Sequence, residues 1–414
     1  MHLDNMEQIQ KRVLEDMDLS EENDDARLRE KIEEKVWEHG KCHLISLEEE
    51  QRYVQEIFCS LRKLDVLEEL LQDESVTEIM VNGYQKIFYE KAGRLYTWDK
   101  QFAGREKLED VIQKMVGKNN RVVNEAMPIA DARLEDGSRV HIVLEPTAID
   151  GSCITIRKFP KEPMTMKRLI ELQTLSEEAA RFLDMLVRAG YNIFISGGTG
   201  SGKTTFLNAL SGCIPTGERI ITIEDSAELQ LHGIANLIRL ETRCANVKGM
   251  EEITIRDLIR AALRMRPDRI IVGECRGAEA LDMLQAMNTG HDGSLSTGHA
   301  NSCEDMLHRL ETMVLMGMEL PLSAIRGQIA SGVDILVHVG RMRDGSRKLL
   351  NIMEVGAYTD GRIELYPLWE FQEKGEKGGR VIGEWKSRER LKNTRKLEWA
   401  GICLLYTSPS PRDA

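Results

Sequence analysis

The chain has 414 residues, of which 42% are hydrophobic and 30% are charged, and its formal net charge is −12. This length allows two or three domains, and the composition is typical of a globular protein with a charge-rich surface. A strongly acidic chain is a poor general binder of nucleic acid, because neutralising phosphates requires clustered Lys and Arg. We therefore expect no direct nucleic-acid binding, although a local basic channel is not excluded.

No stretch approaches 18 consecutive apolar residues, so the sequence predicts no transmembrane helix. The first 30 residues are acidic and polar and do not resemble a signal peptide. The eight cysteines form no Cys-x-x-Cys pair, which disfavours a zinc site, and we expect reduced thiols in a cytoplasmic protein. They are Cys42, Cys59, Cys153, Cys213, Cys244, Cys275, Cys303 and Cys403.

Residues 1–60 are predicted to form a charged helical extension. Acidic and basic residues are dense there, and apolar residues recur at roughly helical spacing, which indicates one or two amphipathic helices. We interpret the segment as a solvated extension, and a docking arm for a partner is the alternative.

Residues 61–160 are predicted to be a smaller mixed α/β N-terminal domain of about 100 residues, a usual domain size. The patterns predict helices over 64–71 and 107–117, strands over 76–83, within 85–96 and over 151–159, and a hairpin over 131–144. The hairpin contains an Asp-Gly turn signal between two alternating runs.

Residues 161–175 follow as a linker, and residues 176–400 form a second domain. Its first helix is predicted to begin after Ser176 as N-cap and to end at Gly190. Apolar strand-like runs alternate with helical patterns at 191–195, 219–223, 236–240, 269–273 and 333–339. This alternation predicts an α/β fold with a mostly parallel sheet covered on both faces.

Residues 403–414 fit nothing before them, since they lack periodicity and are rich in Pro and Ser. They resemble the translation of a sequencing-adapter read-through. We therefore leave this tail out of functional reasoning.

Residues 197–204 have the sequence Gly-Gly-Thr-Gly-Ser-Gly-Lys-Thr and follow the apolar run 191–195. This G-x-x-x-x-G-K-[ST] pattern at a strand-to-helix turn is typical of a loop whose backbone N–H groups cradle phosphates. Its glycines permit the backbone conformations required, and the helix adds its positive dipole end. We predict that a nucleoside triphosphate binds at Gly197, Gly198, Thr199, Gly200, Ser201, Gly202, Lys203, Thr204 and Thr205, with the Thr204 hydroxyl as a ligand of Mg²⁺.

Carboxylates follow two of the predicted strands. Glu274 comes after the run 269–273, and Glu224 and Asp225 come after the run 219–223. Because carboxyl ends of parallel strands gather at one sheet edge, Glu274 is expected to face the γ-phosphate as general base or water orienter. Glu224 and Asp225 are expected to hold Mg²⁺ or to orient the nucleophile. The alternatives are an exposed loop carboxylate and acids that stabilise a helix N-terminus.

The segment 290–301 is interpreted as a polar, Gly-rich loop that senses the γ-phosphate. His291 and His299 are its candidate donors to phosphate or to Glu274, and structural histidines are the alternative. Arginines suited to phosphate contact are plentiful, and the sequence alone does not choose among them.

Together these segments resemble the secretion ATPase superfamily of type II and type IV systems, over about residues 60–400. The similarity is greatest to the CpaF-type ATPase of tight-adherence (Flp) pilus assembly. The matching blocks are a Walker A loop, an Asp box, a Walker B run in which Glu274 stands in place of the usual Asp, and a His box. They cover 197–205, 221–229, 264–274 and 287–302, and the first domain matches at 76–83 and 136–140.

The resemblance implies a RecA-like P-loop NTPase motor domain that hydrolyses Mg-ATP in a homohexameric ring. It implies that the N-terminal domain closes over the nucleotide, with Arg139 and Arg157 as the matching arginines that reach it. An inner-membrane platform protein of a pilus or secretion system is the implied partner, so the protein is expected in the cytoplasm beside the membrane. The alternatives are a pilus-retraction or conjugation-type motor, a RecA-like nucleic-acid translocase and a non-hydrolysing scaffold ring.

Overall fold

The structure is a computed structural model that describes residues 9–13, 15–16, 25–42, 45–91, 93–117, 123–159, 164–231, 233–243 and 251–402. The chain divides into two compact units, Met1–Lys161 and Glu162–Ala414. The predicted adapter-like tail 403–414 lies outside the described residues, as do residues 1–8 and 160–163. No helix in the described ranges is long and apolar enough to cross a membrane.

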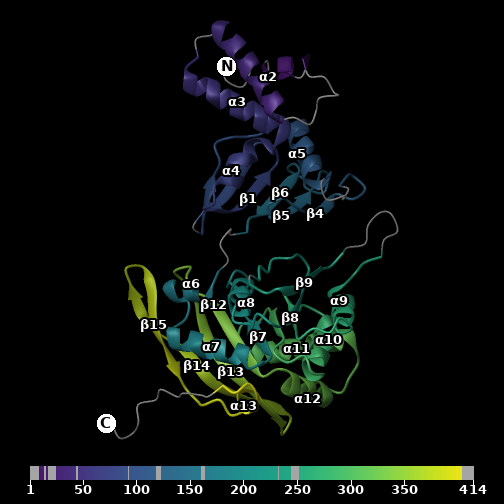
Figure 1. The fold of residues 1–414 in the computed structure, drawn as a ribbon, viewed down its shortest axis with the longest axis vertical. Helices are drawn as coiled ribbons and strands as arrows, with labels where there is room; N and C mark the ends of the chain where they lie inside the picture. Colours follow the sequence, from purple (N-terminus) through teal and green to yellow (C-terminus); the bar gives the residue numbers. More distant parts are fainter. Residues whose placement is uncertain are drawn as a thin grey trace. The chain divides into compact units, whose positions relative to one another are not determined.

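After a short helical segment at residues 9–13, the first unit contains two amphipathic helices, α2 (Asp25–Cys42) and α3 (Leu47–Arg62) (Figure 1). Their apolar faces form a small core that includes Ile32, Val36 and Ile57. Helix α3 begins with a capping box, in which Ser46 and Glu49 satisfy each other's backbone N–H groups. The helices predicted for the charged extension are therefore present in its described part.

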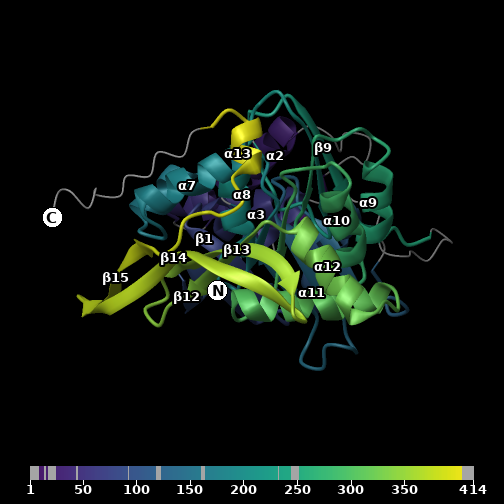
Figure 2. The ribbon, with the colours of Figure 1, turned by 90° about the horizontal axis from the view of Figure 1, so that it is seen from below.

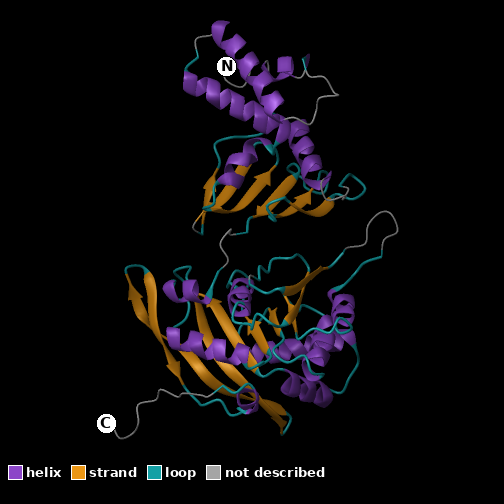
Figure 3. Ribbon diagram, in the orientation of Figure 1, coloured by secondary structure: helices purple, strands orange, loops and turns teal. Residues whose placement is uncertain are grey.

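The rest of the first unit is built on a six-stranded antiparallel sheet in the order β3-β2-β1-β6-β5-β4. Figure 3 shows helices packed beside the strands of this unit. One face packs on the helices through an apolar core. The elements are a 3₁₀ turn η2 (Asp65–Leu67), α4 (Glu68–Gln72), β1 (Val76–Asn82), β2 (Lys86–Lys91), β3 (Arg94–Thr97), α5 (Arg105–Gly117), β4 (Ile129–Arg133), β5 (Arg139–Val143) and β6 (Cys153–Arg157). The predicted strands and hairpin are confirmed.

The helix predicted over 64–71 is wrong as a single element. Asp65 has a left-handed backbone (φ 57°), which interrupts the helical path. The chain therefore makes a short 3₁₀ turn before the five-residue helix α4.

The second unit contains a nine-stranded sheet in the order β15-β14-β13-β12-β7-β11-β10-β8-β9. Strands from β12 to β9 in that order are parallel, and β13, β14 and β15 extend the sheet with antiparallel pairing. The strands are β7 (Ile193–Ser196), β8 (Arg219–Glu224), β9 (Asn236–Glu241), β10 (Arg269–Val272), β11 (Leu295–Gly298), β12 (Ile335–Arg341), β13 (Arg347–Thr359), β14 (Arg362–Lys377) and β15 (Arg380–Ser387). The mostly parallel α/β prediction is confirmed, and Figure 2 shows the long antiparallel strands beside it.

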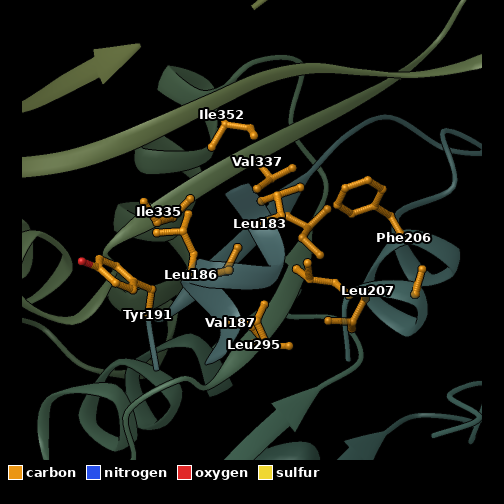
Figure 4. Packing of buried hydrophobic residues seen from close by; sticks show 14 of the residues in the cluster. Leu183, Leu186, Val187, Tyr191, Phe206, Leu207, Leu295, Ile335, Val337 and Ile352 are labelled. Carbon is orange, nitrogen blue, oxygen red and sulfur yellow. The ribbon is translucent and has the colours of Figure 1, made fainter. Parts of the chain in front are cut away.

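Helices cover both faces of this sheet. Successive strand residues point to opposite faces, so Ile193 and Ile195 join one apolar cluster while Phe194 joins the other. Figure 4 shows the first cluster, where Leu183 and Phe206 from two helices pack on the strands. The helices are α6 (Met166–Glu171), α7 (Glu177–Arg188), α8 (Lys203–Ser211), α9 (Ile255–Ala262), α10 (Glu279–Asn288), α11 (Cys303–Gly317), α12 (Leu322–Gly332) and α13 (Arg395–Trp399).

The predicted limits of the helix that follows Ser176 are confirmed. Ser176 is the N-cap of α7 and its side chain accepts a hydrogen bond from the Ala179 N–H, while Gly190 follows the helix in a left-handed conformation (φ 78°). Helix α6 lies inside the segment 161–175 that the sequence suggested as a linker.

The segment 290–301 is not simply a loop, because it contains the buried central strand β11. Its hydroxyl groups find partners within the sheet: Thr297 Oγ1 donates to the Gly273 carbonyl at 2.7 Å. Internally satisfied polar groups can be buried at little cost, so a strand without an apolar run is stable there.

Candidate active site

The phosphate loop connects β7 to α8, as predicted. Gly200 and Gly202 have positive φ values of 71° and 91°, which side chains rarely adopt. A Cβ on Gly197 would lie 2.4 Å from the Val339 carbonyl oxygen of β12, so glycine is required there by space. Gly198 has open space and no positive φ, so neither requirement applies to it.

Helix α8 presents its N-terminus to the phosphate position. Lys203 is its first residue, and the N-cap Gly202 makes no side-chain cap hydrogen bond. The first N–H groups of a helix have no partner within it, so those of Lys203, Thr204 and Thr205 are suited to bind phosphate oxygens. Together with the glycine cradle, this arrangement fits a nucleotide triphosphate tail.

A chain of contacts joins the loop lysine to the carboxylate after β10. The nearly buried Lys203 Nζ donates to the Gly198 carbonyl at 3.1 Å and lies 3.3 Å from His299 Nδ1. His299 Nε2 lies 2.7 Å from Glu274 Oε1. The structure therefore brings His299 and Glu274 together across 25 residues of sequence, although Oε1 has no hydrogen-bond partner in the described part of the chain, and donation from His299 to Glu274 stays a prediction.

The electrostatics favour a neutral His299. Burial lowers its pKa below the usual 6.5, Glu274 opposes this shift, and Lys203 and Arg276 add to it. A neutral ring that accepts from Lys203 at Nδ1 carries its proton on Nε2, the atom that lies 2.7 Å from Glu274 Oε1. Burial also lowers the pKa of Lys203, while Glu274 raises it.

Glu224 and Asp225 lie at the end of β8, the strand next to β10. Glu224 is 3% exposed, and its Oε1 accepts the N–H groups of Glu228 and Leu229, both at 2.9 Å. Burial raises the Glu224 pKa to about 7. A Cβ on Gly273 would come within 2.9 Å of Glu224 Cγ, so glycine at 273 makes room for this side chain.

These residues fit a magnesium ion that is bound mainly through the nucleotide. Glu224 Oε2 is buried and has no hydrogen-bond partner among the residues that the structure describes, so it is an oxygen available to a cation or its water. In the described part of the chain, no group of three or more His, Cys, Asp or Glu side chains is placed to hold a metal ion by itself. Mg²⁺ at phosphates usually takes only one or two protein oxygens, as the Thr204 hydroxyl and a carboxylate would supply.

His291 does not belong to this site. It precedes β11, whereas His299 follows it, and β11 pairs in parallel with β7. His291 therefore lies at the amino edge of the sheet, where its carbonyl accepts from Ser294 Oγ and its Nδ1 is 3.3 Å from the Ala286 carbonyl oxygen. The prediction that His291 contacts Glu274 or phosphate is wrong, because a whole strand separates the two histidines.

Arg139 and Arg157 lie in the first unit and are directly opposite each other on β5 and β6. Arg133 on β4 is in turn opposite Arg139, and Glu78 on β1 is opposite Arg157. Their neighbours along the strands, such as Val140 and Ile156, point into the core, so the arginines share the other face. The charge of this row is partly compensated within the sheet, because Arg139 Nη2 lies 3.7 Å from Asp131 Oδ1 and Glu78 is opposite Arg157.

Sequence reasoning missed three side chains that touch the loop or its partners. Arg276 donates to Glu274, Arg347 Nε donates to the Gly200 carbonyl at 3.3 Å, and His338 Nδ1 lies 2.8 Å from Ser196 Oγ. Arg276 is only two residues after Glu274, so the strand end could have suggested it. The other two come from β12 and β13, and their proximity follows only from the strand order.

A phosphate loop, a carboxylate after a neighbouring parallel strand and a histidine between them define a P-loop ATPase on an α/β motor domain. The family described as type II/IV secretion system protein matches residues 60–355. This chain belongs to that family, and it is an ATPase.

Relatives agree with this assignment, and solved structures agree with the fold. A putative conjugal transfer protein of Mycobacterium tuberculosis is 35% identical over 327 residues, covering 76% of this chain and 92% of the relative. The type IV secretion system protein PtlH of Bordetella pertussis is 34% identical, covering 72% and 94%. The fold is similar to the pilus retraction motor PilT with bound ADP (TM-score 0.52, 19% identity, 85% and 98% covered) and to the ATPase DotB of Legionella pneumophila (TM-score 0.50, 21% identity, 71% and 80% covered).

Proposed function

We propose that this chain is a hexameric motor that couples Mg-ATP hydrolysis to pilus assembly or protein secretion. It acts from the cytoplasmic side on an inner-membrane platform protein. The contact chain from Lys203 through His299 to Glu274 is the observation that supports hydrolysis rather than nucleotide binding alone. Secretion is supported by the names of relatives that match most of their own length.

Each residue at the loop has a distinct role in this proposal. The loop N–H groups and Lys203 bind the β- and γ-phosphates, and Glu274 orients and deprotonates the attacking water. His299 links the two and responds to the γ-phosphate through Lys203. Mg²⁺, held by Thr204 and the phosphates with Glu224 and Asp225 nearby, would neutralise charge on the phosphate oxygens. That Arg139 and Arg157 add positive charge to the nucleotide stays a prediction.

A CpaF-type role in tight-adherence pilus assembly is the particular form that the sequence blocks favour. A conjugation-type motor is the second candidate, because the mycobacterial relative is named for conjugal transfer. The acidic net charge of −12 disfavours a motor that moves along DNA.

The test is the rate of Mg-ATP hydrolysis against protein concentration for a chain that ends at Gly401. Wild type, Lys203→Ala, Glu274→Gln and the exposed control Glu178→Gln are compared. We expect specific activity to rise with concentration as the ring assembles. Both site variants should lose at least about a hundred-fold in rate, the usual contribution of a positioned acid or base. Glu274→Gln should still bind a fluorescent ATP analogue, whereas Lys203→Ala should not.

Two results would contradict the proposal. Normal turnover by Glu274→Gln would remove that residue from catalysis. A rate that does not depend on protein concentration but rises on adding DNA would favour a nucleic-acid translocase over a secretion motor.

A further inference from the structure

We infer that Arg276 is a positioning residue for ATP hydrolysis: it fixes the Glu274 carboxylate so that one oxygen atom keeps its acceptor positions for the attacking water. The inference rests on the proposed role of Glu274. It concerns a residue that belongs to neither the phosphate loop nor the four sequence blocks.

The contacts of Glu274 determine which of its oxygens can receive water. Arg276 donates to Oε2 twice, from Nε at 2.8 Å and from Nη2 at 2.6 Å. Each carboxylate oxygen accepts about two hydrogen bonds, so these two bonds fill Oε2. His299 Nε2 lies 2.7 Å from Oε1, but Oε1 is buried and has no hydrogen-bond partner in the described part of the chain. The free acceptor positions of the carboxylate are therefore on Oε1, the atom that faces the Lys203–His299 chain.

A second carboxylate holds the other arm of the guanidinium. Arg276 Nη1 lies 3.5 Å from Asp225 Oδ2. Asp225 follows β8 and Glu274 follows β10, so Arg276 bridges the ends of two neighbouring strands. The planar guanidinium offers donors in fixed directions, which a lysine ammonium does not. The bridge therefore sets the direction of the Glu274 carboxylate as well as its position.

The backbone of Arg276 is fixed in turn. Glu279, the first residue of α10, accepts the N–H of Arg276 at 2.6 Å and that of Gly277 at 2.9 Å through one carboxylate oxygen. The preceding residue, Cys275, donates its N–H to the Thr297 carbonyl of β11 at 2.8 Å. The backbone at the base of the Arg276 side chain is therefore fixed by hydrogen bonds to helix α10 and strand β11.

The exposed fraction of the Arg276 side chain distinguishes a positioning role from a role in folding stability. The Arg276 side chain is 60% exposed, and exposed ion pairs contribute little to stability because water screens them. Removing Arg276 should therefore disturb the Glu274 carboxylate without unfolding the second unit, Glu162–Ala414, which is called the motor unit below.

The test compares Arg276→Ala and Arg276→Lys with Arg181→Ala, an exposed arginine in an ion pair on α7 that serves as control. Hydrolysis is measured as single turnovers with enzyme in excess, so that slow rates remain readable, beside ATP affinity and thermal unfolding. We expect Arg276→Ala to lower the rate about ten-fold or more, with unchanged ATP affinity and unfolding temperature. Arg276→Lys should recover part of the rate, since one donor to Oε2 is restored.

The double variant Arg276→Ala/Glu274→Gln decides whether Arg276 acts through Glu274. If it does, the double variant is no slower than Glu274→Gln alone, because effects of residues that act as a unit are not additive. An additive further loss, an unchanged or faster rate for Arg276→Ala, or a loss explained by weaker ATP binding would overturn the inference. Normal turnover by Glu274→Gln would instead refute the proposed function, whatever Arg276→Ala does.

Discussion

Glu224 should make the stability of the motor unit fall as pH rises. Burial raises its pKa from 4.5 to about 7, so the folded chain keeps a proton that the unfolded chain loses near pH 4.5. Between these values the folded state binds more protons, and the free energy of unfolding decreases with pH. The contribution is complete below pH 4.5 and is lost above pH 7. At about 1.36 kcal/mol per pH unit, the difference between 7 and 4.5 corresponds to about 3 kcal/mol.

Glu224→Gln isolates this effect. Glutamine keeps the shape and the acceptor for the Glu228 and Leu229 N–H groups but stays neutral. The free energy of unfolding is measured with urea at pH 5 and pH 8 in EDTA, by the fluorescence of Trp369 and Trp385. We expect the variant to gain stability relative to wild type from pH 5 to pH 8, by most of the 3 kcal/mol. Glu178→Gln should show no such gain. An equal difference between Glu224→Gln and wild type at both pH values would refute the argument, because Glu224 would then be ionised in the folded chain.

Two further predictions concern the phosphate loop. Because burial lowers the pKa of His299, the hydrolysis rate should hold down to about pH 6.5 and fall below it, as protonated Nδ1 turns from acceptor to donor toward Lys203. His299→Gln should be slower and lack that decline in its pH–rate profile, and an identical profile would contradict the contact chain. Gly197→Ala should lower the free energy of unfolding by about 1–3 kcal/mol, since its Cβ would overlap the Val339 carbonyl. The matched Gly198→Ala, with open space around it, should unfold like wild type in the same urea titration, and equal losses in both would refute the steric reason.

The sequence predicted those strands of the motor unit that are continuous apolar runs. Strand β11 was not predicted because its residues, such as Ser296 and Thr297, are polar. The hydrogen-bond partners of their side chains follow only from the positions of the neighbouring residues in the fold. The antiparallel strands β13–β15 were not predicted because they are long and rich in charged residues. Their cross-strand ion pairs, such as Lys374 with Glu384 and Arg388 with Glu370, replace the apolar pattern that predicts a buried strand.

Part of the site could likewise be predicted from the sequence, and part could not. The loop 197–205 and the position of Glu274 could be predicted, because a local motif and the end of a strand define them. The contact between Lys203 and His299 could not be derived from spacing, since it requires β11 to lie between β7 and β10. The same strand order is what separates His291 from the site.

Strands β12 and β13 also determine the shape of the phosphate loop. The loop begins against the Val339 carbonyl of β12, and the preceding Ser196 contacts His338 of the same strand. The carbonyl of Gly200, in the middle of the loop, accepts a hydrogen bond from Arg347 at the start of β13.

Lys348, the next residue of β13, points the other way and donates to the Gln173 carbonyl at 2.5 Å, just after α6. Adjacent residues of one strand therefore contact the phosphate loop and the segment through which the chain enters the motor unit. The motif alone defines the chemistry of the loop, but residues about 140 positions later define the geometry in which that chemistry works.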